Sequence, residues 1–152
     1  MNLYKEEKAR GVITNSAGNH GQAVAYQAYK MGIKATIVMP KQTPHVKIQG
    51  CEKYKANVIV EGNGFDEAFE IACKLCREQN LTFIHAFNDP YIVSGQGTLG
   101  LEILHQNPYI DTIISPIGLF FLIFFLLMNT GGGGLIAGTS LAVKSINPTV
   151  KM

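Results

Sequence analysis

The amino-acid sequence predicts an α/β protein in which helices cover a parallel sheet. Short apolar segments alternate along the chain with longer segments of helical periodicity, and this order of elements builds a parallel sheet covered by helices. Two glycine-containing motifs also fall where an expected strand meets an expected helix. Ligands collect at such joints in α/β folds, so we expect the function to lie there.

The first half of the chain predicts a compact unit of three or four strands. We expect strands at residues 12–16, 35–39 and 57–60, an extended segment at 82–85, and helices at 22–31, 45–55 and 65–79. Gly32 stands where a helix C-cap belongs, and Pro40 ends the second strand. Thr43 and Pro44 occupy the cap and first-turn positions of the second helix.

The second half predicts fewer elements. Asn88, Asp89 and Pro90 form a cap with proline at the first helical position, and the helix should reach residue 106. A strand at 112–115 and a helix at 134–144 follow, and a last strand should begin at Val150. Because that strand would be cut off, we expect the C-terminus to be truncated.

Composition limits the class of function. The 152 residues suffice for one ordinary domain, or for a small domain and part of another. With 47% hydrophobic and 16% charged residues the chain is typical of globular proteins, which argues against disorder. A net charge of +2, from 13 basic and 11 acidic residues, provides no basic stripe, so we expect no nucleic-acid partner.

Three cysteines and a charged N-terminus without an apolar core indicate a reducing cytosol. Cys73 and Cys76 form a C-x-x-C, which suggests either redox chemistry or half a zinc site. They lie within a helical segment, far from a strand-to-helix turn, and no second pair of ligands follows. Structural thiols are the favoured interpretation, and we expect no metal site.

Residues 119–128 are ten consecutive apolar residues. A membrane-spanning helix needs about 20, and Pro116 and Gly118 interrupt any extension upstream. An interfacial anchor is the alternative, but the segment has no polar face. The pattern therefore argues against a membrane role.

The first candidate site joins the first strand to the first helix. It runs from Asn15 to Gln22, and its candidate ligand-binding residues are Ser16, Ala17, Gly18, Asn19 and His20. A helix N-terminus offers unpaired N–H groups and partial positive charge, so it can hold a carboxylate or phosphate. Gly18 permits close approach, and Ser16 and Asn19 add directed hydrogen bonds. The alternative, equally supported by spacing, is that Ser16 and Asn19 merely cap the helix.

The second candidate site is a run of four glycines before the helix that begins near Leu135, namely Gly131, Gly132, Gly133 and Gly134. Consecutive glycines can turn their N–H groups toward one concavity that binds an anion, and the helix dipole reinforces it. A flexible linker is the alternative. Phosphate loops are frequent between a strand and a helix, so the position favours phosphate binding.

Both motifs resemble those of one known family. Residues 16–20 look like the asparagine loop, and Pro116-Ile117-Gly118 with 131–135 look like the glycine loop, of fold-type II enzymes that use pyridoxal 5′-phosphate (PLP). Threonine dehydratases (threonine ammonia-lyases) and serine racemases belong to it. Further matches are 9–12, 35–40, 95–98 and 145–148. The resemblance implies an incomplete three-layer parallel sheet of the tryptophan synthase β-like fold. Residues 11–80 would form its small domain and 86–152 part of its large PLP-binding domain.

The resemblance also implies roles for single residues. Asn19 would hydrogen-bond the 3′-oxygen of PLP, and Ser16, Ala17, Gly18, Asn19 and His20 would hold the substrate carboxylate. His20 should shape the loop rather than transfer protons. Gly131 to Gly134 would cradle the cofactor phosphate. In the 95–98 motif, the glycines should permit tight packing of the 90–106 helix and carry no chemistry.

Ala17 bears on the reaction. Serine racemases resemble one another in having a second serine here, which acts on the opposite face of the cofactor from the lysine, and alanine cannot exchange a proton. We therefore expect a lyase that converts L-threonine or L-serine by β-elimination to a 2-oxo acid and ammonia. Serine racemase is the alternative. A cytoplasmic location and a homo-oligomeric full-length protein complete the expectation.

Two departures from the family bear on activity. The Schiff-base lysine lies in a Ser-x-Lys-x-Arg-Gly stretch upstream of the asparagine loop, and Lys5 and Lys8 lack that context. We therefore expect no catalytic residue in this chain, and little turnover from it alone. Residues 119–130 also interrupt the glycine loop as an apolar insert. The pattern leaves open two non-enzymatic functions, a non-catalytic fragment that pairs with intact subunits and a membrane-attached binding module.

Overall fold

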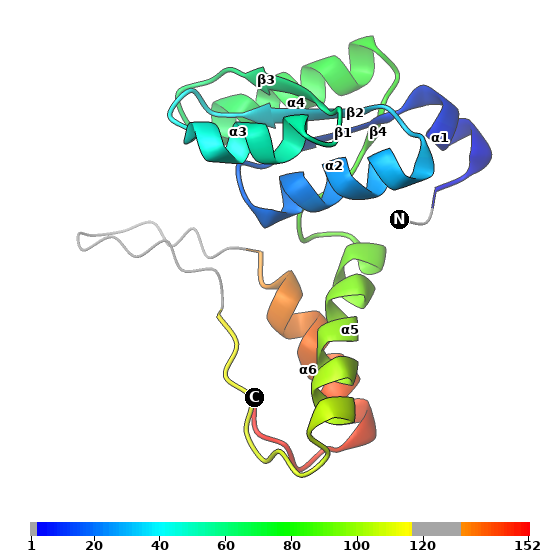
Figure 1. The fold of residues 1–152 in the computed structure, drawn as a ribbon, viewed down its shortest axis with the longest axis vertical. Coiled ribbons are helices and arrows are strands. Elements are labelled where there is room, and N and C mark those ends of the chain that lie inside the picture. Colours follow the sequence, from blue (N-terminus) through cyan, green and yellow to red (C-terminus); the bar gives the residue numbers. More distant parts are fainter. Residues whose placement is uncertain (1–2, 117–131) are drawn as a thin grey trace. The chain divides into compact units, whose positions relative to one another are not determined.

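The computed structural model describes residues 3–116 and 132–152, which form two compact units (Figure 1). The N-terminal unit is Met1–Ala86 and the C-terminal unit is Phe87–Met152. The apolar run 119–128 and the insert 119–130 lie outside the described residues.

A parallel sheet forms the centre of the N-terminal unit. Its strands are β1 (Val12–Asn15), β2 (Ala35–Met39), β3 (Asn57–Val60) and β4 (Thr82–Phe83), in the order β3-β2-β1-β4. Every pair is parallel, with Val12 of β1 opposite Ala35 on one side and Thr82 on the other. The alternation of β-branched strands with helical segments therefore predicted the sheet correctly.

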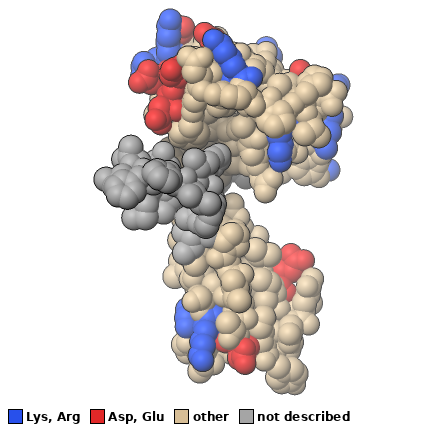
Figure 2. Space-filling model, turned by 90° about the vertical axis from the view of Figure 1, so that its left-hand side faces the viewer, with Lys and Arg blue, Asp and Glu red and all other residues tan. Residues whose placement is uncertain are grey.

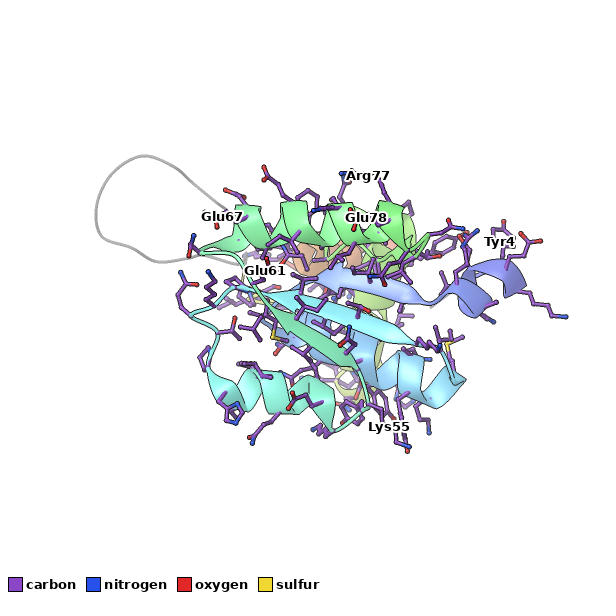
Figure 3. The ribbon with its side chains drawn as sticks, turned by 90° about the horizontal axis from the view of Figure 1, so that it is seen from above. Tyr4, Lys55, Glu61, Glu67, Arg77 and Glu78 are labelled. Carbon is purple, nitrogen blue, oxygen red and sulfur yellow. The ribbon has the colours of Figure 1, made fainter. Side chains whose placement is uncertain are left out.

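Helices cover both faces of this sheet. Helices α2 (Asn19–Met31) and α3 (His45–Glu52) lie on one face and α4 (Phe65–Glu78) on the other, which makes the expected three layers (Figure 3). On the α4 side, Ile13 and Val38 pack against Ala68 and Ala72. All four are fully buried, because small alanines let the helix approach the sheet closely.

Several boundaries differ from the sequence-based expectation. Helix α2 begins three residues early, at Asn19, and so takes in part of the first motif. Helix α3 is preceded by Pro44 in the N-cap position, so the expectation that Thr43 caps it is wrong. A short helix, α1 (Lys5–Arg10), was not expected. Its N-terminus is stabilised by Glu7, whose carboxylate accepts a hydrogen bond from the Tyr4 backbone N–H at 2.7 Å.

The C-terminal unit is built on two helices, α5 (Pro90–Gln106) and α6 (Gly134–Ile146). As expected, Asp89 caps α5, and its carboxylate accepts from the N–H groups of Tyr91 and Ile92. Leu104, Ile113, Val143 and Val150 form the core of the unit. Of the strands expected at 112–115 and from Val150, the described residues keep only one parallel bridge, between Thr112 and Lys151.

Glycines let α5 and α6 pack closely. A Cβ on Gly97 would lie 3.1 Å from the carbonyl oxygen of Gly138, and one on Gly100 would lie 2.9 Å from that of Thr139. The packing role expected of the 95–98 motif is thus confirmed for Gly97. It is wrong for Gly95, because a Cβ there would meet no atom within 4 Å. Within 3–116 and 132–152, no helix has the length and apolar character that crossing a membrane requires.

Candidate functional site

The first motif lies at the carboxyl edge of the sheet, at its point of reversal. From β1 the chain passes through α2 to β2 and then to β3, moving steadily away from β1. After α4 it returns to pair β4 with the free side of β1. In open α/β sheets the crevice at such a reversal, at the carboxyl ends of the strands, is where ligands bind. The loop 16–20, which follows β1, occupies this place.

The backbone N–H groups at the start of α2 are not capped by a side chain. The N–H of Gly18 donates to Ser16 Oγ at 3.2 Å, and Gly18, the N-cap residue of α2, makes no side-chain cap bond. The alternative that Ser16 or Asn19 caps the helix is therefore wrong. The first bond of the helix runs from the N–H of Gln22 to the carbonyl of Gly18, at 3.4 Å. The N–H groups of residues 19–21 precede it and suit an anion at the helix start.

Gly21 lies within the first motif, although no role was expected for it from the sequence. A Cβ at this position would lie 2.5 Å from the carbonyl oxygen of Ser16 and 3.2 Å from Ile37 Cγ2. Since both neighbours are packed against the helix, the loop can fold back onto α2 only if residue 21 has no side chain. A glycine directly before the helix expected at 22–31 was the available signal.

His20 points back into the sheet. Its Nε2 lies 3.1 Å from Thr14 Oγ1 and 3.3 Å from the carbonyl oxygen of Ile84, just after β4. Burial lowers the pKa of His20, the hydrogen bond to Ile84 opposes that change, and the nearby His85 adds to the lowering. The ring is thus favoured in its neutral form, as suits a residue that shapes the loop.

Asn15, the last residue of β1 and the first of the motif, is a second polar anchor, a role that was not expected from the sequence. It is 3% exposed, and its Nδ2 donates to the carbonyl oxygen of Phe65, the first residue of α4, at 3.1 Å. Its Oδ1 is buried and has no hydrogen-bond partner among the described residues. Asn15 therefore connects the start of the loop to the opposite layer.

The second motif lies at the start of α6. Gly131, Ile117 and Gly118 are outside the described residues. Gly133 is the N-cap residue, with φ 68° and ψ 3°, a left-handed conformation that favours glycine. A Cβ on Gly132 would overlap the side chain of Phe87, and one on Gly134 would touch it at 3.4 Å.

This segment fits a phosphate group. The first helical bond runs from the N–H of Ala137 to the carbonyl of Gly133, so the N–H groups of residues 134–136 have no acceptor within the helix. No side chain caps α6. A bare backbone with several outward N–H groups at a helix start is the donor set that a phosphate takes.

The other donors that PLP would need also fit. Asn19 is exposed at the first position of α2, where its amide can donate to a ring oxygen.

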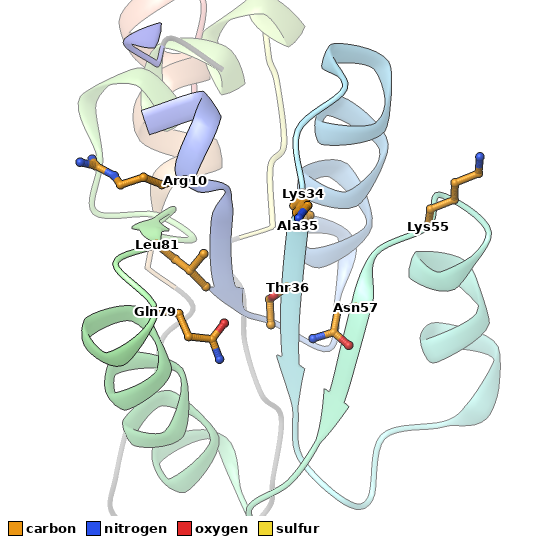
Figure 4. Close-up of a pocket in the computed structure, with 8 residues that line it drawn as sticks. All are labelled: Arg10, Lys34, Ala35, Thr36, Lys55, Asn57, Gln79 and Leu81. Carbon is orange, nitrogen blue, oxygen red and sulfur yellow. The ribbon is translucent and has the colours of Figure 1, made fainter. Parts of the chain in front are cut away.

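A separate hollow of about 480 Å³ lies at the amino ends of the strands, remote from the loop 16–20 (Figure 4). Thr36 and Asn57 line it, but the charged ends of Arg10 and Lys55 point away from it (Figure 4). We assign it no ligand.

Comparison with known proteins finds one family. Residues 1–152 match the family described as pyridoxal-phosphate dependent enzyme. An L-threonine ammonia-lyase of Thermotoga maritima is 46% identical over 150 residues, which are 99% of this chain and 34% of that protein. The chain therefore spans about a third of the length of this relative.

Solved structures agree. The processed form of threonine deaminase isoform 2 from Solanum lycopersicum is similar with a TM-score of 0.84 and 40% identity, covering 99% of this chain and 40% of that one. Maize serine racemase is similar with a TM-score of 0.85 and 38% identity, covering 97% of this chain and 41% of that one. The α/β fold expected from the sequence, with its parallel sheet, is confirmed by these likenesses.

Proposed function

Because the chain belongs to the family of pyridoxal-phosphate-dependent enzymes, we propose that the whole protein converts L-threonine or L-serine by β-elimination to a 2-oxo acid and ammonia. The similarity to a threonine ammonia-lyase and to a threonine deaminase supports this reaction class. The observation that carries the proposal is the uncapped start of α2 at the reversal point of the sheet. There, backbone N–H groups can hold a substrate carboxylate.

In this proposal each unit contributes binding groups. The N-terminal unit corresponds to the small domain, expected at residues 11–80, and residues 16–20 hold the amino-acid carboxylate. Asn19 also donates to the 3′-oxygen of the cofactor. The C-terminal unit corresponds to part of the large domain, expected at 86–152, and its glycines 131–134 hold the phosphate. When bound, PLP supplies an electron sink that stabilises negative charge at the substrate Cα.

We assign no catalytic base among the described residues. Lys5 and Lys8 lie on α1, outside the loop 16–20, and neither has the sequence context of the family's cofactor lysine. His20 is favoured in its neutral form, and its Nε2 is occupied by Thr14 and Ile84. The role of this chain is therefore to bind and orient substrate and cofactor.

Serine racemase is the second candidate, supported by the similarity to the maize enzyme. Racemisation needs a proton-exchanging group on each face of the reacting carbon. Ala17, between Ser16 and Gly18 in the substrate loop, ends in a methyl group that cannot exchange a proton. This residue favours the lyase.

Position 17 also provides the test. In the whole protein, PLP-dependent release of 2-oxobutanoate from L-threonine and pyruvate from L-serine should exceed formation of D-serine. Replacing Ala17 by Ser should raise the ratio of racemisation to elimination, because the hydroxyl restores an exchangeable proton. Formation of D-serine without 2-oxo acid by the unmodified protein would establish the racemase instead. An unchanged ratio in A17S would remove the role given to position 17.

The remaining features of the proposal concern partners and location. The face drawn in Figure 2 carries basic and acidic side chains without a broad basic stripe, and with the net charge of +2 this supports the proposal that nucleic acid is not a partner. Cys51, Cys73 and Cys76 are free thiols, which suits the reducing cytoplasm. We propose a homo-oligomer for the whole protein by analogy with the family.

A further inference from the structure

Two side chains at the ends of the substrate loop reach residues that are distant in sequence. Asn15 precedes the loop and donates to the carbonyl oxygen of Phe65, 50 residues away, at 3.1 Å. His20 ends the loop and contacts the carbonyl oxygen of Ile84, 64 residues away, at 3.3 Å. The loop is thus attached at both ends to segments that flank the crossing from β3 to β4 through α4.

The acceptors determine which atoms must donate. A carbonyl oxygen can only accept, so the amide of Asn15 must direct its NH₂ group toward Phe65. For the same reason Nε2 of His20 must carry a hydrogen to bond Ile84, which leaves Nδ1 of the neutral ring without one. The carbonyl oxygen of Phe65 therefore favours one amide orientation, and that of Ile84 favours the imidazole tautomer with hydrogen on Nε2.

Burial makes these bonds directional constraints. Asn15 is 3% exposed, and Thr14, whose hydroxyl also lies 3.1 Å from His20 Nε2, is fully buried. Buried polar groups that lose a partner cannot exchange it freely for water. The bond from Gly18 to Ser16 Oγ is local by comparison, and it shapes the turn without fixing where the turn lies on the sheet.

We propose that Asn15 and His20 are positioning residues that hold the loop 16–20 in its ligand-binding conformation. They do so by attaching both ends of the loop to the backbone of the α4 and β4 side of the unit. The inference rests on the proposed function only for the identity of the ligand, the carboxylate of an amino acid. Preorganisation of this kind increases affinity because no conformational entropy is lost in ordering the loop when the ligand binds.

The first experiment measures the loop without ligand, in the full chain. Nitrogen NMR of the His20 ring should show the tautomer with hydrogen on Nε2 at neutral pH. Hydrogen exchange of the Ser16, Gly18 and Gln22 amides, which donate to Val38, Ser16 and Gly18, should accelerate about tenfold in His20→Ala. That factor corresponds to the loss of one hydrogen bond of ordinary net strength. Asn15→Ala should act in the same direction.

Matched variants separate positioning from general destabilisation. His20→Gln should return exchange to near the unmodified rate, because the glutamine amide can donate where Nε2 did. His45→Ala, at the exposed first position of α3, should change nothing. Hydrogen on Nδ1 of the neutral ring would overturn the proposal. Exchange in His20→Ala that is not accelerated, while its melting transition is intact, would also overturn it. Exchange in His20→Gln as fast as in His20→Ala would do the same. If His20→Ala fails to fold, His20→Gln and Asn15→Ala decide.

The second experiment adds L-threonine as the probe and follows the same amides. Its dissociation constant should rise about tenfold in His20→Ala and recover in His20→Gln, in proportion to the lost hydrogen bond. Equal affinities in all variants would overturn the positioning role. If the unmodified chain does not bind L-threonine while the exchange results hold, the carboxylate-binding role proposed for residues 16–20 of this chain fails and the positioning of the loop stands.

Discussion

The two loops that begin α2 and α6 are stabilised in opposite ways. The loop 16–20 of the N-terminal unit is held by side chains, since Asn15 and His20 donate to carbonyl oxygens far away in sequence. The segment 132–134 of the C-terminal unit depends on missing side chains, because a Cβ on Gly132 would overlap Phe87 and Gly133 has φ 68°. The first should tolerate any replacement that keeps an N–H donor. The second should not tolerate a side chain at residue 132, and at residue 133 a side chain should strain the backbone.

The same contrast extends to the packing of each unit. In the N-terminal unit, the β-branched residues Ile13 and Val38 fill the space between the sheet and α4. In the C-terminal unit, Gly97, Gly100 and Gly138 bring α5 and α6 close enough for backbone atoms to touch. A core that is filled by side chains can adjust its rotamers, whereas one made of backbone contacts cannot.

The largest effect should come from adding a methyl group between α5 and α6. In Gly138→Ala the new Cβ would overlap the carbonyl oxygen of Val93 and lie 2.8 Å from the N of Gly97. Because both neighbours are backbone, the helices must separate, and we expect a loss of about 3 kcal/mol in the free energy of unfolding. Urea denaturation followed by circular dichroism measures it.

Gly95 provides the matched control on the facing helix. A Cβ there would meet no atom within 4 Å, and the residue lies inside α5. Gly95→Ala should therefore stabilise the protein by about 0.5 to 1 kcal/mol, the difference in helix propensity. Similar changes in the two variants would contradict the proposed close contact of the helices.

A smaller effect is expected at the phosphate segment. Gly133→Ala has open space around its Cβ, so its cost arises only from the left-handed backbone, about 1 to 2 kcal/mol. If the strain is relieved by turning the N–H groups away, affinity for PLP should fall by a factor of roughly 5 to 30.

Pyridoxal, which lacks the phosphate, is the control ligand for this variant. Its affinity, measured by the same fluorescence titration, should not change in Gly133→Ala. Equal weakening of PLP and pyridoxal would place the phosphate elsewhere. An unchanged PLP affinity would show that the conformation of Gly133 does not matter for binding.

Much of the N-terminal unit could be predicted from the sequence because its signals are local. The strands 35–39 and 57–60 were placed correctly by their apolar residues and the turn residues beside them. The missed helix α1 also had a local signal, with Glu6 and Glu7 in its first turn and Arg10 in its last. The helix was not predicted because it has only six residues and no apolar stripe.

Long-range contacts could not be predicted in this way. Asn15 resembles any polar residue at the end of a strand, and only the fold brings Phe65 within 3.1 Å of its amide. The strand expected at 112–115 shows the opposite error. Its apolar residues do favour extended structure, but a strand needs partners, and the described residues provide one bridge to Lys151. The motif was recognised and His20 was expected to shape the loop, but the residues that Asn15 and His20 contact were not predicted.

The smallest effect should be a pH dependence of stability. It should arise at the loop 16–20 and not at the segment 132–134, since only the first depends on an imidazole. Burial lowers the pKa of His20 in the folded protein below its ordinary value of 6.5. The unfolded chain then binds more protons than the folded one once the pH falls below 6.5, so stability contributed by neutral His20 is complete above 6.5 and is lost toward acid. Urea denaturation at about pH 7.5 and about pH 5.5, read at the N-terminal unit, measures the effect. The free energy of unfolding should decrease less in His20→Gln than in the unmodified chain, because glutamine does not titrate.

Other titrating groups do not account for this difference. Glu67, whose pKa is lowered by hydrogen bonds from Asn63, acts below its ordinary value of 4.5 and so outside this range. His85 lies near His20 and is present in both proteins. Equal decreases would mean that the ring of His20 accepts a proton in place, and that the loop 16–20 depends no more on a neutral side chain than the glycines of α6 do.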